Sequence, residues 1–162
     1  MRVAVVMGSK NDLPKLTDMI DLLKEFGVEV NVRALSAHRA HVALGEFIHD
    51  ANNNGTEVVI AAAGKAAHLP GVIASMTSSP VIGIPIKGSA LDGMDALLSI
   101  VQMPAGIPVA TVAIDGSVNA GILAIQMMAI KHPDLKAKLE AYRAKMTADV
   151  IAANEEVVAQ YN

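Results

Sequence analysis

The sequence contains no cysteine and no tryptophan, and it has only two phenylalanines and two tyrosines. Without cysteine no disulfide can form, which fits a reducing compartment, so we expect a cytoplasmic protein. Aromatic rings for base stacking are scarce and the net charge is -3, so a nucleic-acid partner is not expected. No apolar run approaches the roughly 18 residues of a membrane-spanning helix, and residues 1–8 lack the features of a signal peptide. A membrane partner is therefore not expected either.

Charged side chains are also scarce in the middle third of the chain. Between residues 58 and 114 they are limited to Lys65, Lys87, Asp92 and Asp95. This is too little polar surface for a small monomer, so we expect sister subunits to cover part of the region. The protein is predicted to be a homo-oligomer.

Apolar runs alternate with helix-periodic segments, a pattern that is typical of parallel βαβ units. The expected strands are residues 3–7, 28–35, 58–63, 81–84 and 109–114, and the expected helices are residues 13–26, 41–53, 72–76, 91–102 and 118–130. They predict one α/β domain of 162 residues, a three-layer doubly wound, flavodoxin-like fold whose five parallel strands have the order 2-1-3-4-5. Residues 133–161 form a long amphipathic helix that follows the core of residues 1–131, and we expect it to pack on a neighbouring subunit.

Ligands of doubly wound folds bind at the carboxyl ends of the strands, near the point where the strand order reverses. In this chain that point brings together the loops after the first three strands, residues 8–12, 36–39 and 64–71. Gly8 and Ser9 allow close backbone approach and offer hydrogen-bond donors, and Asp12 can accept hydrogen bonds from ribose hydroxyls. These loops predict a site for a phosphate and a sugar.

The turn Ser36-Ala37-His38-Arg39 combines a hydroxyl, an imidazole and a guanidinium at the end of an expected strand. Ser36 is expected to cap the following helix, and Arg39 can hold a phosphate or carboxylate through its planar fork. An imidazole titrates close enough to neutral pH to transfer protons, which makes His38 a candidate acid and base. A capped helix start followed by a surface His and Arg is also a common structural pattern, and these four residues alone leave that alternative open.

The third loop contains two further candidates, Lys65 and His68. His68 lies between Ala67 and Leu69, where a histidine is either a core or capping residue or a catalyst. Lys65 is either a cation that faces the ligand or an exposed surface side chain. The position at the end of a strand gives the catalytic alternative for His68 as much weight as the structural one, and for Lys65 both alternatives stay open.

Several other catalytic classes lack their motifs. A Walker A loop is excluded, because Val59 stands where its first glycine is needed and Ala66 where its serine or threonine is needed. Neither GxGxxG nor GxSxG is present, so a dinucleotide site and a serine hydrolase are not indicated. His38 and His41 are three positions apart, but no third ligand follows at metal-binding spacing. The motifs therefore predict neither a metal site nor a dinucleotide cofactor.

Ordered sequence blocks run along nearly the whole chain: Met7–Asp12, Ser36–Arg39, Ala66–Gly71, Pro80–Gly83, Leu91–Gly93, Leu97–Pro104, Gly106–Val112 and Asn119-Ala120. Together they resemble the N5-carboxyaminoimidazole ribonucleotide mutase family of purine biosynthesis. The resemblance implies a cofactor-free isomerase that moves a carboxyl group from the exocyclic nitrogen of an aminoimidazole ribonucleotide to ring carbon C4. It also implies a homo-octamer with sites at subunit junctions, and a substrate that is passed on by the ATP-dependent synthetase that makes it.

The same resemblance implies a role for each candidate residue. His38 would be the general acid and base, and His68, with the small residues Ala66 and Ala67, would keep CO2 away from water. Binding of the ribose phosphate end would fall to Gly8, Ser9, Asp12 and Arg39, with Ser36 assisting.

Three positions depart from the family pattern. Lys65 replaces the usual glycine, Asn11 replaces the usual serine, and the link at residues 114–117 is shorter. With a cation at position 65, the loop resembles that of the relatives that carboxylate aminoimidazole ribonucleotide directly with CO2. The retained His68-Leu69-Pro70-Gly71, in contrast, resembles the mutases. Direct carboxylation and a binding-only protein therefore remain the alternatives.

Overall fold

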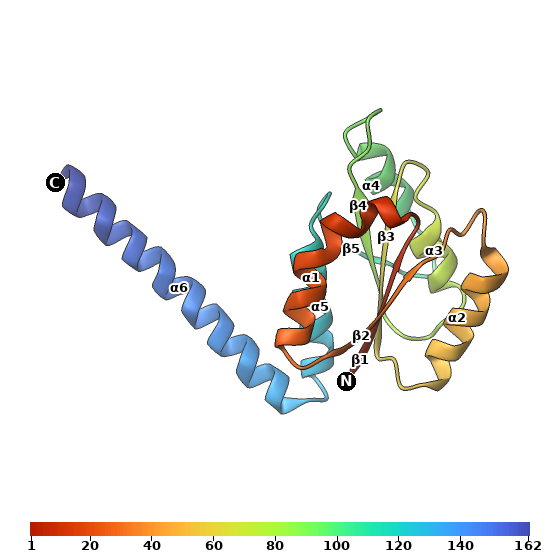
Figure 1. The fold of residues 1–162 in the computed structure, drawn as a ribbon, viewed down its shortest axis with the longest axis horizontal. Coiled ribbons are helices and arrows are strands. Elements are labelled where there is room, and N and C mark those ends of the chain that lie inside the picture. The colour runs from red at the N-terminus through yellow and green to blue at the C-terminus, as the bar shows by residue number, and fades with distance from the viewer. The chain divides into compact units, whose positions relative to one another are not determined.

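Figure 1 shows the computed structural model, which describes residues 1–162. The chain divides into two compact units, Met1–Ala124 and Ile125–Asn162, and each is described by itself. The division falls within helix α5 (Ser117–Ala129). None of the helices combines the length and the apolar character needed to cross a membrane.

The first unit is built on a parallel five-stranded sheet with the order β2-β1-β3-β4-β5, which confirms the predicted fold class and strand order. The strands are β1 (Arg2–Met7), β2 (Glu29–Ala34), β3 (Val58–Gly64), β4 (Val81–Ile86) and β5 (Ala110–Thr111). The helices are η1 (Lys10–Asp12), α1 (Leu13–Glu25), α2 (His41–Asn53), α3 (Leu69–Ala74), α4 (Met94–Val101) and the start of α5.

Helices cover both faces of the sheet, which explains why its central strands are apolar without alternation. On one face, Ala4 and Val6 of β1 belong to a buried cluster with side chains of α2, α3 and α4. On the other face, α1 packs against the first part of α5, where a Cβ added to Gly121 would lie 3.0 Å from Cγ of Met19. Figure 1 shows α1 and the first part of α5 on one side of the strands and α2 and α3 on the other.

Helix α3 begins at Leu69, earlier than the predicted residue 72. Pro70 lies in its first turn, where a proline costs no hydrogen bond because that N–H has no partner within the helix. The Val72 N–H donates to the carbonyl of His68 at 2.9 Å. His68 therefore lies at the N-cap of α3, and not in the open loop predicted from the sequence.

Strand β5 is much shorter than the predicted residues 109–114. It pairs only with β4, through Ala110 and Thr111, because it forms the edge of the sheet. One more ladder bond, from the Val112 N–H to the Gly83 carbonyl at 3.1 Å, follows before the chain turns away. The link to α5 then contains Asp115 with φ of 54°.

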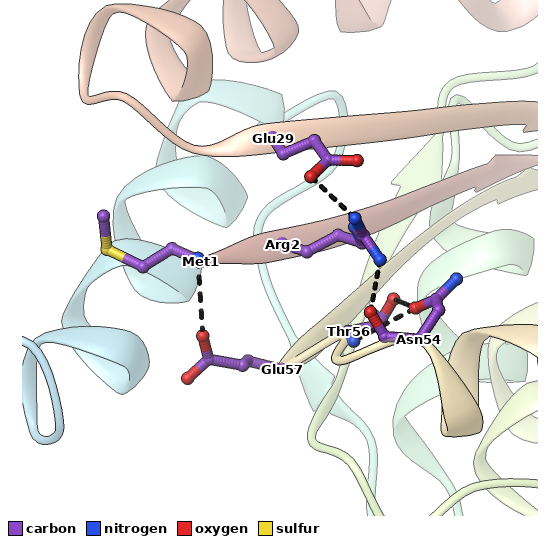
Figure 2. A network of polar contacts seen from close by, with 6 residues as sticks. All are labelled: Met1, Arg2, Glu29, Asn54, Thr56 and Glu57. Carbon is purple, nitrogen blue, oxygen red and sulfur yellow. Dashed lines mark hydrogen bonds and ion pairs between the residues drawn. The ribbon is translucent and has the colours of Figure 1, made fainter.

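A polar network connects the amino-terminal ends of the strands, which lie opposite the ends that carry the predicted site (Figure 2). Arg2 forms an ion pair of 2.8 Å with Glu29 at the start of β2 and donates to the Asn54 carbonyl before β3. The amino group of Met1 lies 3.9 Å from Glu57. The network joins the starts of three strands, but such exposed pairs contribute little to stability.

The second unit consists of the end of α5 and the long helix α6 (Pro133–Tyr161), whose predicted bounds are confirmed. Pro133 occupies the first turn, and Asp134 is favoured there by the helix dipole. Within α6 only Leu135 and Leu139 are buried. Its later apolar side chains are exposed: Met146, Val150, Ile151, Val157, Val158 and Tyr161.

Candidate active site

A cleft of about 620 Å³ lies at the carboxyl ends of β1, β2, β3 and β4. Nine of the residues predicted from the sequence line it: Gly8, Ser9, Asp12, Ser36, His38, Arg39, Lys65, Ala66 and His68. Ala67 does not line the cleft. It is 1% exposed and belongs to the buried core cluster. Its neighbours Ala66 and His68 are exposed on the cleft instead.

One wall of the cleft was not predicted from the sequence: it is formed at the carboxyl end of β4 by Ile86, Lys87 and Gly88. Only the three loops next to the switch point were predicted to form the site. Since β4 pairs in parallel with β3, its carboxyl end reaches the same edge of the sheet. The predicted strand order already contained this signal. Four other lining residues, Asn11, Ala37, Gly64 and Leu69, lie within the three predicted loops but were not singled out, and Ala63 lies just before the third loop.

The first loop closes into the short helix η1, whose N-cap is Ser9. The Ser9 hydroxyl accepts a hydrogen bond from the Asn11 N–H at 3.2 Å, and the Ser9 carbonyl accepts from the Asp12 N–H at 3.0 Å. The Ser9 O–H can still donate to a ligand. A Cβ added to Gly8 would meet nothing within 4 Å, so the backbone there is open to close approach.

The predicted cap on α2 is wrong. Helix α2 begins at His41, its N-cap is Ala40, and no side chain caps it. Ser36 lies a full turn earlier, where its carbonyl accepts from the N–H groups of Arg39 at 3.3 Å and Ala40 at 2.9 Å. The Ser36 hydroxyl is therefore left on the cleft without a protein partner.

Two histidines from different loops meet in the cleft. Nε2 of His38 lies 2.8 Å from Nδ1 of His68, and the rings are almost perpendicular, at 89° with centroids 5.0 Å apart. One nitrogen of this pair must carry the hydrogen while the other offers its lone pair. The contact thus fixes both rings and leaves Nδ1 of His38 and Nε2 of His68 for a ligand. Both side chains are exposed to the cleft.

Positive charge dominates the lining. Arg39 and Lys65 have no ion-pair partner, whereas Lys87 pairs with Asp92 at 3.1 Å. Asp12 is the one acidic side chain of the lining. This balance suits an anionic ligand with a phosphate or a carboxylate. No group of three or more His, Cys, Asp or Glu side chains could hold a metal ion.

Burial raises the pKa of Asp12. A hydrogen bond from the Ser9 backbone and the charge of Lys15 oppose this shift, while the charge of Asp115 adds to it. The folded protein therefore disfavours the ionised form of Asp12. Its contribution to stability is greatest below the unfolded pKa and is lost as pH rises through the folded pKa.

We expect Asp12→Asn to raise the free energy of unfolding at pH 7 by no more than about 0.5 kcal/mol, or roughly 1–2 °C in Tm, because the side chain is only partly buried and water screens its charge. The gain should disappear as pH falls through the folded pKa of Asp12, because the aspartic acid is then neutral as well. Thermal unfolding of both proteins between pH 7 and pH 4 tests this. Asp18→Asn on the exposed side of α1 is the control. A gain that does not depend on pH would contradict the assigned cause.

Comparisons with known proteins agree with one another. Residues 2–149 match the model of the family described as AIR carboxylase. The N5-carboxyaminoimidazole ribonucleotide mutase of Pyrococcus abyssi is 52% identical over 145 residues, which cover 90% of this chain and 83% of that protein. The mutase of Saccharolobus solfataricus is 48% identical over 155 residues, or 96% of this chain and 98% of that protein.

Among solved structures, the chain is similar to PurE from Treponema denticola, with a TM-score of 0.88 and 23% identity. The match covers 96% of this chain and 97% of that one. At this level of identity the likeness concerns the fold, and it supports the doubly wound architecture described above.

Proposed function

This chain belongs to the AIR carboxylase family, and we propose that it converts N5-carboxyaminoimidazole ribonucleotide into 4-carboxy-5-aminoimidazole ribonucleotide in purine biosynthesis. The observation that carries the proposal is the contact between His38 and His68 inside a cleft of positive charge. A reaction that adds one proton and removes another needs such a group, and a ribonucleotide with two anionic ends needs the charge.

The ribose phosphate end binds at the first two loops. Arg39 pairs with the phosphate, and Ser9 and Ser36 donate their hydroxyl hydrogens to it. Gly8 allows the backbone to approach, and Asp12 accepts hydrogen bonds from the ribose hydroxyls. The imidazole end then points toward the histidines.

The chemistry has two steps. The bond between the exocyclic nitrogen and its carboxyl group breaks, the nitrogen gains a proton, and CO2 and a nucleophilic aminoimidazole are formed. C4 then attacks CO2, a carbon–carbon bond forms, and C4 loses its proton. His38 supplies the first proton and accepts the second, while His68 holds its ring in place. Ala66 and His68 flank the space that holds CO2 between the two steps. The bound substrate keeps water out of this space.

An absorbance assay with two substrates tests this function. One cuvette contains N5-carboxyaminoimidazole ribonucleotide at low bicarbonate, and the other contains aminoimidazole ribonucleotide with bicarbonate. Product from the first alone supports the mutase. Equal or faster product from the second would assign the chain to direct carboxylation by CO2, and no product in either would indicate a protein that only binds.

Lys65 holds the carboxylate of the substrate. Its backbone adopts φ of 56°, a left-handed conformation that costs a residue with a side chain about 1–2 kcal/mol. Its side chain is exposed and lines the cleft without an ion-pair partner. A position that is strained, cationic and open to the ligand is better explained by binding than by packing.

We expect Lys65→Gly and Lys65→Ala to raise KM by a similar factor, about tenfold, because both remove the cation. Only glycine relieves the backbone, so the glycine variant should be more stable than the alanine variant by about 0.5–1 kcal/mol. Steady-state kinetics and urea unfolding of the two variants measure these effects. An unchanged KM in both variants would show that Lys65 does not bind the substrate.

The protein is further proposed to be a cytoplasmic homo-octamer that needs no cofactor and receives its substrate from the ATP-dependent synthetase that makes it. Exposed apolar side chains on α4 (Met94, Leu98 and Val101) and along α6 support subunit contacts, and α6 is proposed to pack on a neighbouring subunit. Sedimentation of the purified protein tests the assembly, since a monomeric mass would refute it.

A further inference from the structure

The end of β4 is held from outside the cleft by two charged residues that the reaction does not otherwise use. Lys15 lies on α1 and Asp115 in the link between β5 and α5, 100 positions away along the chain. Nζ of Lys15 lies 2.9 Å from Oδ1 and 2.8 Å from Oδ2 of Asp115. Neither residue lines the cleft, and both line a separate hollow next to α1.

The pair holds both polar groups of the Lys87 backbone. The Lys87 N–H donates to Oδ1 of Asp115 at 2.9 Å, and Nζ of Lys15 donates to the Lys87 carbonyl at 3.2 Å. The Asp115 N–H donates to the Pro85 carbonyl at 2.8 Å. Residues 85–87 are thus fixed from outside, and residues 86–88 are the β4 wall of the cleft.

These contacts take the place of backbone pairing between β4 and β5, which ends before residues 85–87. The ladder between β4 and β5 stops with the bond from Val112 to Gly83, before it reaches the wall. The left-handed backbone of Asp115 turns the link back toward β4, a conformation that aspartate tolerates better than most residues. Without the carboxylate, the Lys87 N–H would have no partner in the protein.

We propose that Lys15 and Asp115 are positioning residues for the reaction, because they hold the Lys87 peptide and with it the β4 wall at the substrate. This inference rests on the proposed function for its kinetic consequences. The two side chains are 37% and 34% exposed, so the ion pair itself is screened by water. Their effect comes from the hydrogen bonds to the Lys87 backbone.

The pair also acts on Asp12 in a way that a purely structural contact would not. Burial is the largest cause of the raised pKa of Asp12, and among its charged neighbours Lys15 lowers that pKa while Asp115 raises it. Since Asp12 binds the ribose as a carboxylate, Lys15→Met should move the acid limb of kcat/KM to higher pH. Asp115→Ala should move it to lower pH.

Four variants separate the contacts. Asp115→Ala and Lys15→Met remove hydrogen bonds to the Lys87 backbone and should raise KM about tenfold, with a smaller change in kcat. Asp115→Asn keeps an acceptor for the Lys87 N–H, and Lys15→Arg keeps a charged donor, so both should recover most of the loss. Lys24→Met is the control, because it removes an ion pair on the same helix, with Asp21, that has no contact with Lys87.

Hydrogen exchange of the Lys87 amide gives a readout that needs no turnover. It should be faster in Asp115→Ala than in Asp115→Asn, while the amides of β1 stay protected and show that the fold is intact. Unchanged exchange at Lys87, or an unchanged KM in an active Asp115→Ala protein, would overturn the inference. If the unsubstituted protein shows no turnover, the proposed function fails, and the exchange still decides whether the pair holds the wall.

Discussion

We expect His38→Asn to lower kcat about 10²- to 10⁴-fold with little change in stability. The asparagine amide ends near the position of Nδ1 of the imidazole, so the contact between Nε2 and Nδ1 of His68 is lost, but both side chains are exposed on the cleft and the core is unchanged. The amide cannot accept the C4 proton or return one to nitrogen. Single-turnover measurements on the purified variant report the chemical step directly.

His49→Asn is the matched control for this prediction, because His49 is exposed on α2 and does not line the cleft. It should keep the activity of the unsubstituted protein. Retention of more than about a tenth of kcat in the His38 variant would show that another group transfers the protons. Nε2 of His68 would then be the first candidate, since it also faces the cleft.

We expect Gly83→Ala to lower the free energy of unfolding by about 1–3 kcal/mol, because the site has no room for a methyl group. A Cβ at Gly83 would lie 2.5 Å from Cγ2 of Ile100 on α4 and 2.9 Å from Cγ1 of Val109. Gly83 is in the middle of β4, so the helix packs directly on the strand backbone there. Urea unfolding followed by circular dichroism measures the loss.

Gly45→Ala gives the opposite sign from the same chemical change. Gly45 lies inside α2, and a Cβ added there would meet nothing within 4 Å. Alanine should stabilise this helix by about 0.5–1 kcal/mol relative to glycine. If the two variants were equally stable, contact between α4 and β4 would not explain the glycine at position 83.

Much of the fold could be predicted because burial leaves a strong signal in the sequence. The central strands are covered on both faces, so their apolar runs are continuous, and α2 and α6 match their predicted bounds. Helix α3 was predicted to start too late, because its first turn contains Pro70 and Gly71, which are usually taken as helix breakers. Strand β5 was predicted too long, because an edge strand can leave the sheet while its residues remain apolar.

The candidate site could be predicted from its position in the fold more than from its motifs. His38 and His68 each follow a different strand, and only the parallel order of β2, β1 and β3 brings them within 2.8 Å. The pair of Lys15 and Asp115 could not be predicted in this way. Neither residue lies in a motif, and their contact depends on how a short link turns at the sheet edge.

In the proposed mechanism the carboxyl group is transferred within one cleft, and CO2 is not released to the solvent between the two steps. The most direct measurement supplies N5-carboxyaminoimidazole ribonucleotide with ¹³C in its carboxyl group, in a buffer that contains unlabelled bicarbonate. Mass spectrometry of the product at early times then gives the fraction of label retained at C4, after correction for spontaneous decarboxylation without protein. We expect most of the label to be retained. Label diluted to the level of the dissolved bicarbonate would contradict this mechanism, because the CO2 would then have left the site before recombination.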